Sequence, residues 1–204
     1  MLQTSTVDAL GPINDPLDVL VIGGGQAGLA MGYHLAQRGL RFLIVDAGTA
    51  IGEAWRTRWD SLRLFTPAQY DGLPGMPFPA APDTYPGKDD VADYLQAYVA
   101  AHQLPVRLST AVTSLAREGG VYVARAGDDA IRARQVVIAT GPFHEPLVPS
   151  VAGQLDPAVT QLHSTAYRRP ADLPPGKVLV VGAGNTGAQI AEELAASREV
   201  ELAV

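Results

Sequence analysis

One stretch, residues 18–46, limits what this chain can fold into more than any other. Residues 18–22 are apolar and rich in β-branched side chains, which is typical of a short buried strand. A G-x-G-x-x-G turn follows at once, and residues 29–38 then have the pattern of a helix. A second strand, residues 41–45, ends on Asp46. A glycine triplet alone is weak evidence, but this strand–helix–strand context with a final acid predicts a dinucleotide-binding βαβ unit.

The residues of the glycine turn have distinct physical tasks. Gly23 allows the tight turn out of the strand, and Gly28 lets the helix pack closely on that strand. Gly25 has no side chain, so a pyrophosphate can approach the backbone. The helix start, around Gln26 and Ala27, offers free N–H groups and a partial positive charge to the phosphates.

Asp46 is expected to accept hydrogen bonds from a ribose 2′-hydroxyl. Because its negative charge would repel a 2′-phosphate, this first site is predicted to hold FAD or NAD rather than NADP. The alternative interpretation is an ordinary glycine-rich turn followed by a surface acid.

The same pattern returns near the end of the chain. Residues 177–181 form a predicted strand, a second G-x-G-x-x-G spans Gly182–Gly187, and residues 188–197 form a helix before the strand 199–204. A complete dinucleotide domain needs further βα units, so we expect an N-terminal portion whose second domain is incomplete. Two such motifs predict two nucleotides held face to face. The simplest chemistry between two such nucleotides is hydride transfer from a nicotinamide to a flavin. The residues that read the second ribose are expected beyond Val204.

Between the two motifs, residues 51–86 are rich in Pro, Gly and aromatic side chains without periodicity. We expect ordered loops lying over a ligand, and a Pro-rich excursion that merely caps the sheet is the alternative. Trp55 and Arg56 would suit a flavin and its pyrophosphate. The same two residues would suit a core aromatic and a surface salt bridge.

The remaining elements complete the predicted fold class, which is α/β. Residues 89–102 have helical period, residues 105–108 form a short strand, and a three-stranded antiparallel meander follows at residues 111–117, 121–126 and 130–138. The apolar end of the last strand suits a return to a buried parallel sheet. The prediction is a Rossmann-type FAD-binding domain with a meander insertion plus the start of a second Rossmann-type NAD(P)-binding domain. The expected divisions are a flexible tail (1–16), the first domain (17–149), and a linker with the incomplete second domain (150–204).

Composition excludes several other functions. The net charge of −6 and the lack of a Lys/Arg run argue against nucleic-acid and anionic-membrane partners. The sequence has no apolar run of membrane-spanning length and no signal-peptide pattern, so we expect a soluble cytoplasmic protein. The absence of cysteine excludes disulfides, Cys-ligated zinc and a redox-active Cys pair. The histidines are scattered and predict no metal site: His34, His102, His144 and His163.

Several stretches together resemble a known family. They are residues 21–29, 55–64, 73–79 and 85–88, Ala139–Gly141, His163 and Ser164 with Tyr167, and Gly182–Gly187. The chain resembles the N-terminal half of flavin-dependent monooxygenases that bind FAD and NADPH on paired Rossmann domains. It is most similar to bacterial flavoproteins that themselves resemble the plant auxin-forming flavin monooxygenases.

The resemblance implies the residues of two cofactor sites. The FAD site would comprise Gly23, Gly25, Gln26, Ala27, Gly28, Asp46, Trp55, Arg56 and Thr66, with Ala139, Thr140 and Gly141. The NADPH site would comprise Gly182, Gly184, Asn185, Thr186 and Gly187. In that family the reduced flavin activates oxygen for transfer to a small organic substrate, so no side chain acts as a nucleophile. The implied partners are this substrate and oxygen. Because the second domain is incomplete, a C-terminal half on another chain is a further expected partner.

Two elements of the family pattern differ in this chain. The family's usual aromatic and Gly before the His are Pro157 and Val159 here. Flavin monooxygenases of the amine-oxidising type often have Thr-Asn beside the flavin, where this chain has Thr66-Pro67. Two alternatives stay open. Pro67 in place of Asn favours a flavin reductase or dehydrogenase that does not oxygenate, and the incomplete second domain favours a nucleotide-binding fragment without turnover.

Overall fold

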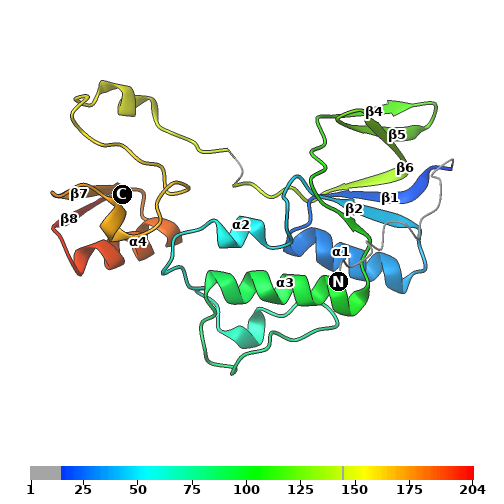
Figure 1. Ribbon diagram of the computed structural model, residues 1–204, viewed down its shortest axis with the longest axis horizontal. Helices are drawn as coiled ribbons and strands as arrows, with labels where there is room; N and C mark the ends of the chain where they lie inside the picture. Colours follow the sequence, from blue (N-terminus) through cyan, green and yellow to red (C-terminus); the bar gives the residue numbers. More distant parts are fainter. Residues whose placement is uncertain (1–14, 144) are drawn as a thin grey trace.

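The computed structural model describes residues 15–143 and 145–204 (Figure 1). The predicted tail, residues 1–16, lies almost wholly outside the described residues, and so does His144. The described chain forms two lobes that are joined by an extended segment and by the loops around α2 (Glu53–Arg56). We call residues 15–143 the first unit and residues 145–204 the second unit.

The first unit is built on a six-stranded sheet with the order β3-β2-β1-β6-β5-β4. Its strands are β1 (Leu17–Ile22), β2 (Phe42–Val45), β3 (Val106–Arg107), β4 (Ser114–Glu118), β5 (Val121–Ala126) and β6 (Asp129–Ile138). Strands β3, β2, β1 and β6 are parallel, whereas β4, β5 and β6 form an antiparallel meander. The predicted fold class, a Rossmann-type unit with a meander insertion, is confirmed.

Strand β6 joins the two parts of this sheet. Its first half pairs with β5, and its residues from Ala133 to Ile138 pair with β1. Beyond Ala133 only the β1 side of β6 is paired among the described strands, so the end of β6 is an edge there. Ile138 is consequently 61% exposed, and the expectation that this apolar end is buried was wrong for Ile138.

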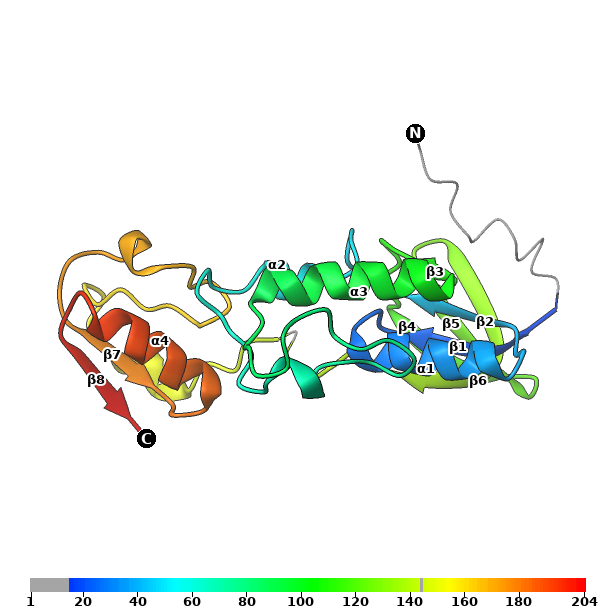
Figure 2. The ribbon, with the colours of Figure 1, turned by 90° about the horizontal axis from the view of Figure 1, so that it is seen from below.

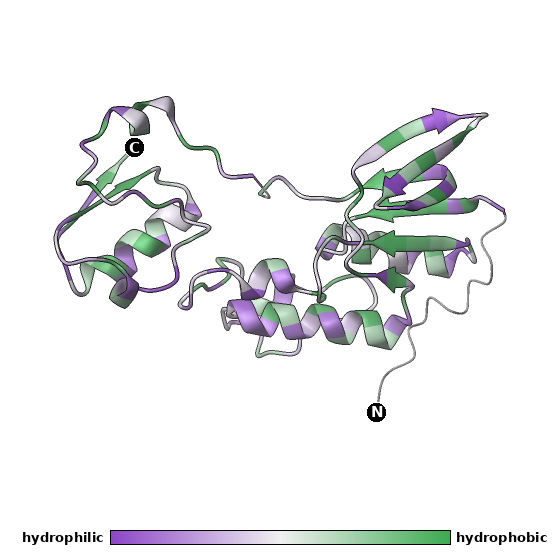
Figure 3. Ribbon diagram, turned by 45° about the horizontal axis from the view of Figure 1, so that its top comes forward, coloured by the Kyte–Doolittle hydropathy of each residue, from purple (hydrophilic) through white to green (hydrophobic). Residues whose placement is uncertain are grey.

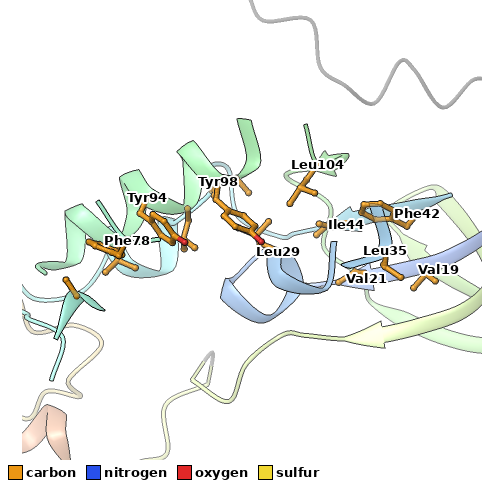
Figure 4. Packing of buried hydrophobic residues seen from close by; sticks show 14 residues of the cluster. Val19, Val21, Leu29, Leu35, Phe42, Ile44, Phe78, Tyr94, Tyr98 and Leu104 are labelled. Atoms are coloured by element: carbon orange, nitrogen blue, oxygen red, sulfur yellow. The ribbon is translucent and has the colours of Figure 1, made fainter. Parts of the chain in front are cut away.

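Two helices pack together on one face of the sheet, α1 (Gln26–Gln37) and α3 (Lys88–His102) (Figures 1 and 2). The apolar face predicted for α3 is buried, with its side chains in one core cluster with those of α1 and β2. In Figure 3 the central strands of the sheet are coloured mostly hydrophobic, and α3 has alternating hydrophobic and hydrophilic bands. In Figure 4 the labelled side chains form a continuous row from Phe78 along α3 to Phe42.

The loops of residues 51–86 are ordered by two tyrosines of α3. The Tyr94 hydroxyl accepts the Leu73 N–H at 2.6 Å and donates to the Met76 carbonyl at 2.7 Å. The Tyr98 hydroxyl donates to the Pro74 carbonyl at 2.6 Å, and burial raises the pKa of Tyr98 to about 12. The short helix α2 and the 3₁₀ turn η2 (Ala68–Tyr70) were not predicted, because the sequence of these loops has no periodicity.

The second unit repeats the first at smaller scale. Strands β7 (Val178–Val181) and β8 (Val200–Ala203) are parallel, and α4 (Asn185–Ala195) connects them. Within residues 145–177, the helical elements are the 3₁₀ turns η3 (Ser150–Gln154) and η4 (Pro170–Asp172). The β7 side chains alternate, so that Val178 and Val180 pack in the unit's core while Leu179 and Val181 are exposed.

The described residues contain neither a membrane-spanning helix nor a metal-binding group of side chains. Across residues 15–143 and 145–204, no helix has the length and apolar character needed to cross a membrane. The same residues contain no group of three or more His, Cys, Asp or Glu arranged to hold a metal ion.

Candidate dinucleotide sites

The first glycine turn has a geometry that only glycine can adopt at two positions. Gly23 has φ +112°, its N–H donates to the Val45 carbonyl at 2.8 Å, and a Cβ there would lie 2.3 Å from the Ala139 carbonyl oxygen. A Cβ on Gly28 would lie 1.9 Å from the Gly23 carbonyl oxygen. The turn is therefore enclosed by its own helix and by the chain that follows β6, where Ala139 donates its N–H to Ile22 at 2.7 Å.

The N-terminus of α1 is open, in contrast to the packed glycines. Gly25 is the N-cap, no side chain caps the helix, and a Cβ on Gly25 would meet nothing within 4 Å. Gly25, Gln26 and Ala27 are all exposed. A helix N-terminus offers N–H groups and a positive dipole end, so this open surface fits a pyrophosphate.

Asp46 ties the turn to the loop that follows β2. Its Oδ2 accepts the Gly24 N–H at 2.5 Å, and its Oδ1 accepts the Gly48 N–H at 2.7 Å. Each carboxylate oxygen can accept a second hydrogen bond, so capacity for a ribose hydroxyl remains. Asp46 is thus more than the isolated surface acid of the alternative interpretation, because it organises the backbone around the turn.

The second glycine turn reproduces the first. Gly182 has φ +101°, its N–H donates to the Ala203 carbonyl at 2.8 Å, and a Cβ on Gly187 would lie 1.9 Å from the Gly182 carbonyl oxygen. The N-cap of α4 is Gly184, again without a side-chain cap and with open space where a Cβ would be. The following helical residues, Asn185 and Thr186, are exposed like Gln26 and Ala27. The structure therefore contains two candidate sites with the same turn conformation. They differ in one respect: a Cβ on Gly182 would meet nothing within 4 Å among the described residues, whereas Ala139 encloses Gly23.

This equivalence identifies the counterpart of Asp46. The N–H of the first glycine in each turn, Gly23 or Gly182, donates to the carbonyl of Val45 or Ala203 respectively. The parallel pairs β1–β2 and β7–β8 also have matching registers. Val204 follows Ala203 as Asp46 follows Val45. By position Val204 is therefore the counterpart of Asp46, and its side chain carries no carboxylate.

The other predicted FAD contacts have protein partners. Trp55 packs against the core clusters of both units. The Arg56 guanidinium pairs with Asp93 and with Asp89 (3.5 Å) of α3, and its hydrogen bond to Asp93 raises the pKa of Arg56. The core-aromatic and surface-salt-bridge interpretation therefore describes what the structure shows for these two residues, and flavin contact stays a prediction.

Thr66 and the chain after β6 complete the predicted set. The Thr66 hydroxyl donates to Asp71 Oδ1, and the second oxygen of Asp71 is buried without a hydrogen-bond partner among the described residues. Thr140 follows Ala139 beside the Gly23 turn, and Gly141 has φ +72°. Ala139 and Thr140 thus lie at the first turn, whereas the structure does not bring Thr66 to it through any hydrogen bond among the described residues.

Sequence reasoning missed the residues that join the two units. Trp59 and Leu62 come from the first unit, yet they pack in the core of the second with Tyr167, Ile190 and Leu194. Gln189 of α4 hydrogen-bonds the backbone of Arg63. The one sequence signal was the apolar character of Trp59 and Leu62 within an irregular loop. That signal does not indicate in which core the two side chains are buried.

Comparisons with known proteins agree with this arrangement. The family model for pyridine nucleotide-disulphide oxidoreductases matches residues 20–204. An uncharacterized oxidoreductase CzcO-like protein of Geobacillus kaustophilus is 49% identical over 188 residues, which make up 92% of this chain and 54% of that protein. The indole-3-pyruvate monooxygenase YUCCA1 of Oryza sativa is 34% identical over 179 residues, covering 86% of this chain and 44% of the relative.

A solved structure extends the likeness to three dimensions. The flavin-containing monooxygenase from Stenotrophomonas maltophilia shares 38% identity and a TM-score of 0.86, over 92% of this chain and 57% of that one. The chain thus spans about half the length of the relatives it matches. Since this chain has no cysteine, the disulphide in the family description does not refer to side chains of its own. The family match includes both glycine turns, and the chain belongs to the pyridine nucleotide-disulphide oxidoreductase family.

Proposed function

We propose that the first turn holds FAD and the second holds NADPH, as part of a flavin-dependent monooxygenase that acts on a small organic substrate. When bound, the nicotinamide supplies a hydride to the flavin, which then activates oxygen. The observation that carries the proposal is the repeated turn, with two open helix N-termini of the same geometry on one chain. The 38% identity to a flavin-containing monooxygenase supports the assignment of the first site.

The chain's own residues would bind and orient the two nucleotides. The exposed N-termini of α1 and α4 would hold the pyrophosphates, and Asp46 would hold the adenosine ribose of FAD. Val204 supports NADPH over NADH at the second site, because no acid at that position repels a 2′-phosphate. We therefore expect tighter binding of NADPH than of NADH, measured by titration of the FAD-loaded protein. A preference for NADH would contradict this assignment.

Oxygen uptake coupled to NADPH consumption, with analysis of products, tests the monooxygenase activity. Pro67, where amine-oxidising relatives have Asn, favours the second candidate, a reductase that passes electrons on without oxygenating. NADPH consumption with an added electron acceptor but without an oxygenated product would support that second candidate. Binding of both nucleotides without NADPH consumption would instead indicate a binding fragment. The cytoplasmic location stays a prediction.

We predict that Asp46→Ala weakens FAD binding about tenfold or somewhat more without unfolding the first unit. Charge-assisted hydrogen bonds to a ribose contribute ~1.5–3 kcal/mol where they are well formed. The carboxylate also positions Gly24 and Gly48, so the loss should lie toward the upper end. FAD titration followed by absorbance measures the change.

Asp18→Ala is the matched control for Asp46→Ala. Asp18 also accepts a backbone N–H, from Arg41 at 2.9 Å, but it lies at the opposite end of β1. Its replacement should leave FAD affinity unchanged. Equal effects of the two substitutions would mean that Asp46 acts only through the stability of the fold.

A further inference from the structure

The contact between the two units depends on residues 59–63, which we call the bridging segment. Trp59 and Leu62 are both buried, at 4% and 8% exposure, in the core of the second unit. They pack there with two residues of α4, Ile190 and Leu194. Part of the core behind the second glycine turn is therefore supplied by chain that follows the first turn by about 30 residues.

Hydrogen bonds fix the orientation of this contact. The Gln189 side chain donates to the Arg63 carbonyl at 2.9 Å and accepts the Arg63 N–H at 3.4 Å, so one amide pairs with both backbone groups of a single residue. The Asp60 N–H donates to the Arg168 carbonyl at 2.9 Å. Gln189 lies about one and a half helical turns from Gly184, the N-cap at which the second pyrophosphate is proposed to bind.

The bridging segment is also fixed to the first unit. Arg63 forms an antiparallel bridge with Gly87, the N-cap of α3, and the Lys88 N–H donates to the Leu62 carbonyl at 3.3 Å. Helix α3 shares one core cluster with α1, which begins at the first glycine turn. Figure 2 shows this order in space, with α2 and the start of α3 between α1 and α4.

The contact between Gln189 and Arg63 lies at the edge of a cleft. A cleft of about 420 Å³ opens beside it between α4 and the first unit, lined by Ser61, Arg63, Leu64, Tyr85, Gln189, Glu192 and Glu193. On this side the Gln189 amide and the Arg63 backbone provide the directional contact. Loss of the amide would leave the apolar contacts of Trp59 and Leu62 and the Asp60–Arg168 backbone hydrogen bond. It would remove both hydrogen bonds that join α4 to the bridging segment.

We propose that the bridging segment sets the position of α4 relative to α1, and that Gln189 is a positioning residue for transfer between the two nucleotides. The second part of this inference rests on the proposed function, because it assumes that a hydride passes between the sites. Transfer requires the reacting atoms at near-contact distance, and small misplacements reduce its rate strongly.

The first test measures the geometry directly. Because the chain has no cysteine, replacing Gln37 and Ala195, exposed at the ends of α1 and α4, by Cys gives two clean sites for spin labels. The distance distribution between the labels should be narrow in the parent and clearly broader or shifted in Gln189→Ala. Glu192→Ala, at an exposed position of the same helix, is the control and should match the parent. An unchanged distribution in Gln189→Ala would overturn the proposal.

The second test measures transfer in the FAD-loaded protein, as this chain or a longer chain that contains it, by anaerobic flavin bleaching at saturating NADPH. Gln189→Ala should slow bleaching about tenfold or more, while the Kd values for FAD and NADPH change less than about twofold. A slower rate with an unchanged distance distribution would contradict the positioning role. A parent that binds both nucleotides without transfer would overturn the proposed function, and the distance measurement would still decide the proposal about geometry.

Discussion

Gly28→Val should abolish FAD binding and lower the thermal stability of the first unit. A Cβ at this position would lie 1.9 Å from the Gly23 carbonyl oxygen and 3.0 Å from the Gly23 carbonyl carbon. Both are backbone atoms of the turn, so rotation of a side chain cannot relieve the clash. Helix α1 would have to move away from β1, and Leu29, buried beneath it, would lose its packing. We expect FAD affinity to fall at least about a hundredfold, or ~2.8 kcal/mol.

Gly25→Ala is the informative partner of Gly28→Val. A Cβ on Gly25 meets nothing within 4 Å, and its φ of −79° suits alanine, so the fold should be unaffected. If a pyrophosphate occupies this space, FAD affinity should still fall, because the methyl group would lie where the phosphate approaches. FAD titration and thermal melting of both variants separate the effects. A Gly25→Ala variant with parental FAD affinity would show that the pyrophosphate does not bind at this turn.

The parts of the fold that local sequence determines were predicted. The two glycine turns, the helices that follow them, the buried face of α3 and the antiparallel meander all depend on short-range patterns. The tightness of each turn also follows from sequence, because only glycine permits the positive φ of Gly23 and Gly182. The structure confirms these features, which local sequence is sufficient to specify.

The features that sequence did not reveal depend on distant partners. Arg56 pairs with acids of α3 more than 30 residues away, and Asp46 accepts a backbone N–H from the first turn. Trp59 and Leu62 read as ordinary loop residues, although they complete the core of the second unit. Sequence periodicity does not indicate such long-range contacts. The connection between the two candidate sites through Trp59 and Leu62 is therefore visible only in the three-dimensional structure.

Gly187→Val should remove NADPH binding while FAD binding is retained. A Cβ on Gly187 would lie 1.9 Å from the Gly182 carbonyl oxygen, the same clash as at Gly28 but in the other unit. Helix α4 would be forced from β7, which displaces its open N-terminus at Gly184. The first unit has its own core cluster, so the FAD site should survive. NADPH titration by calorimetry and FAD absorbance on the same preparation measure both effects.

Gly184→Ala provides the control for the second site, as Gly25→Ala does for the first. Its Cβ would enter open space, so α4 should stay on β7 while NADPH affinity falls. Together the four variants test whether each turn serves one nucleotide. Loss of FAD in Gly187→Val, with α4 displaced, would mean that the first site depends on the second through the bridging segment. Retained NADPH affinity in Gly187→Val would show that the nucleotide binds elsewhere than at the N-terminus of α4.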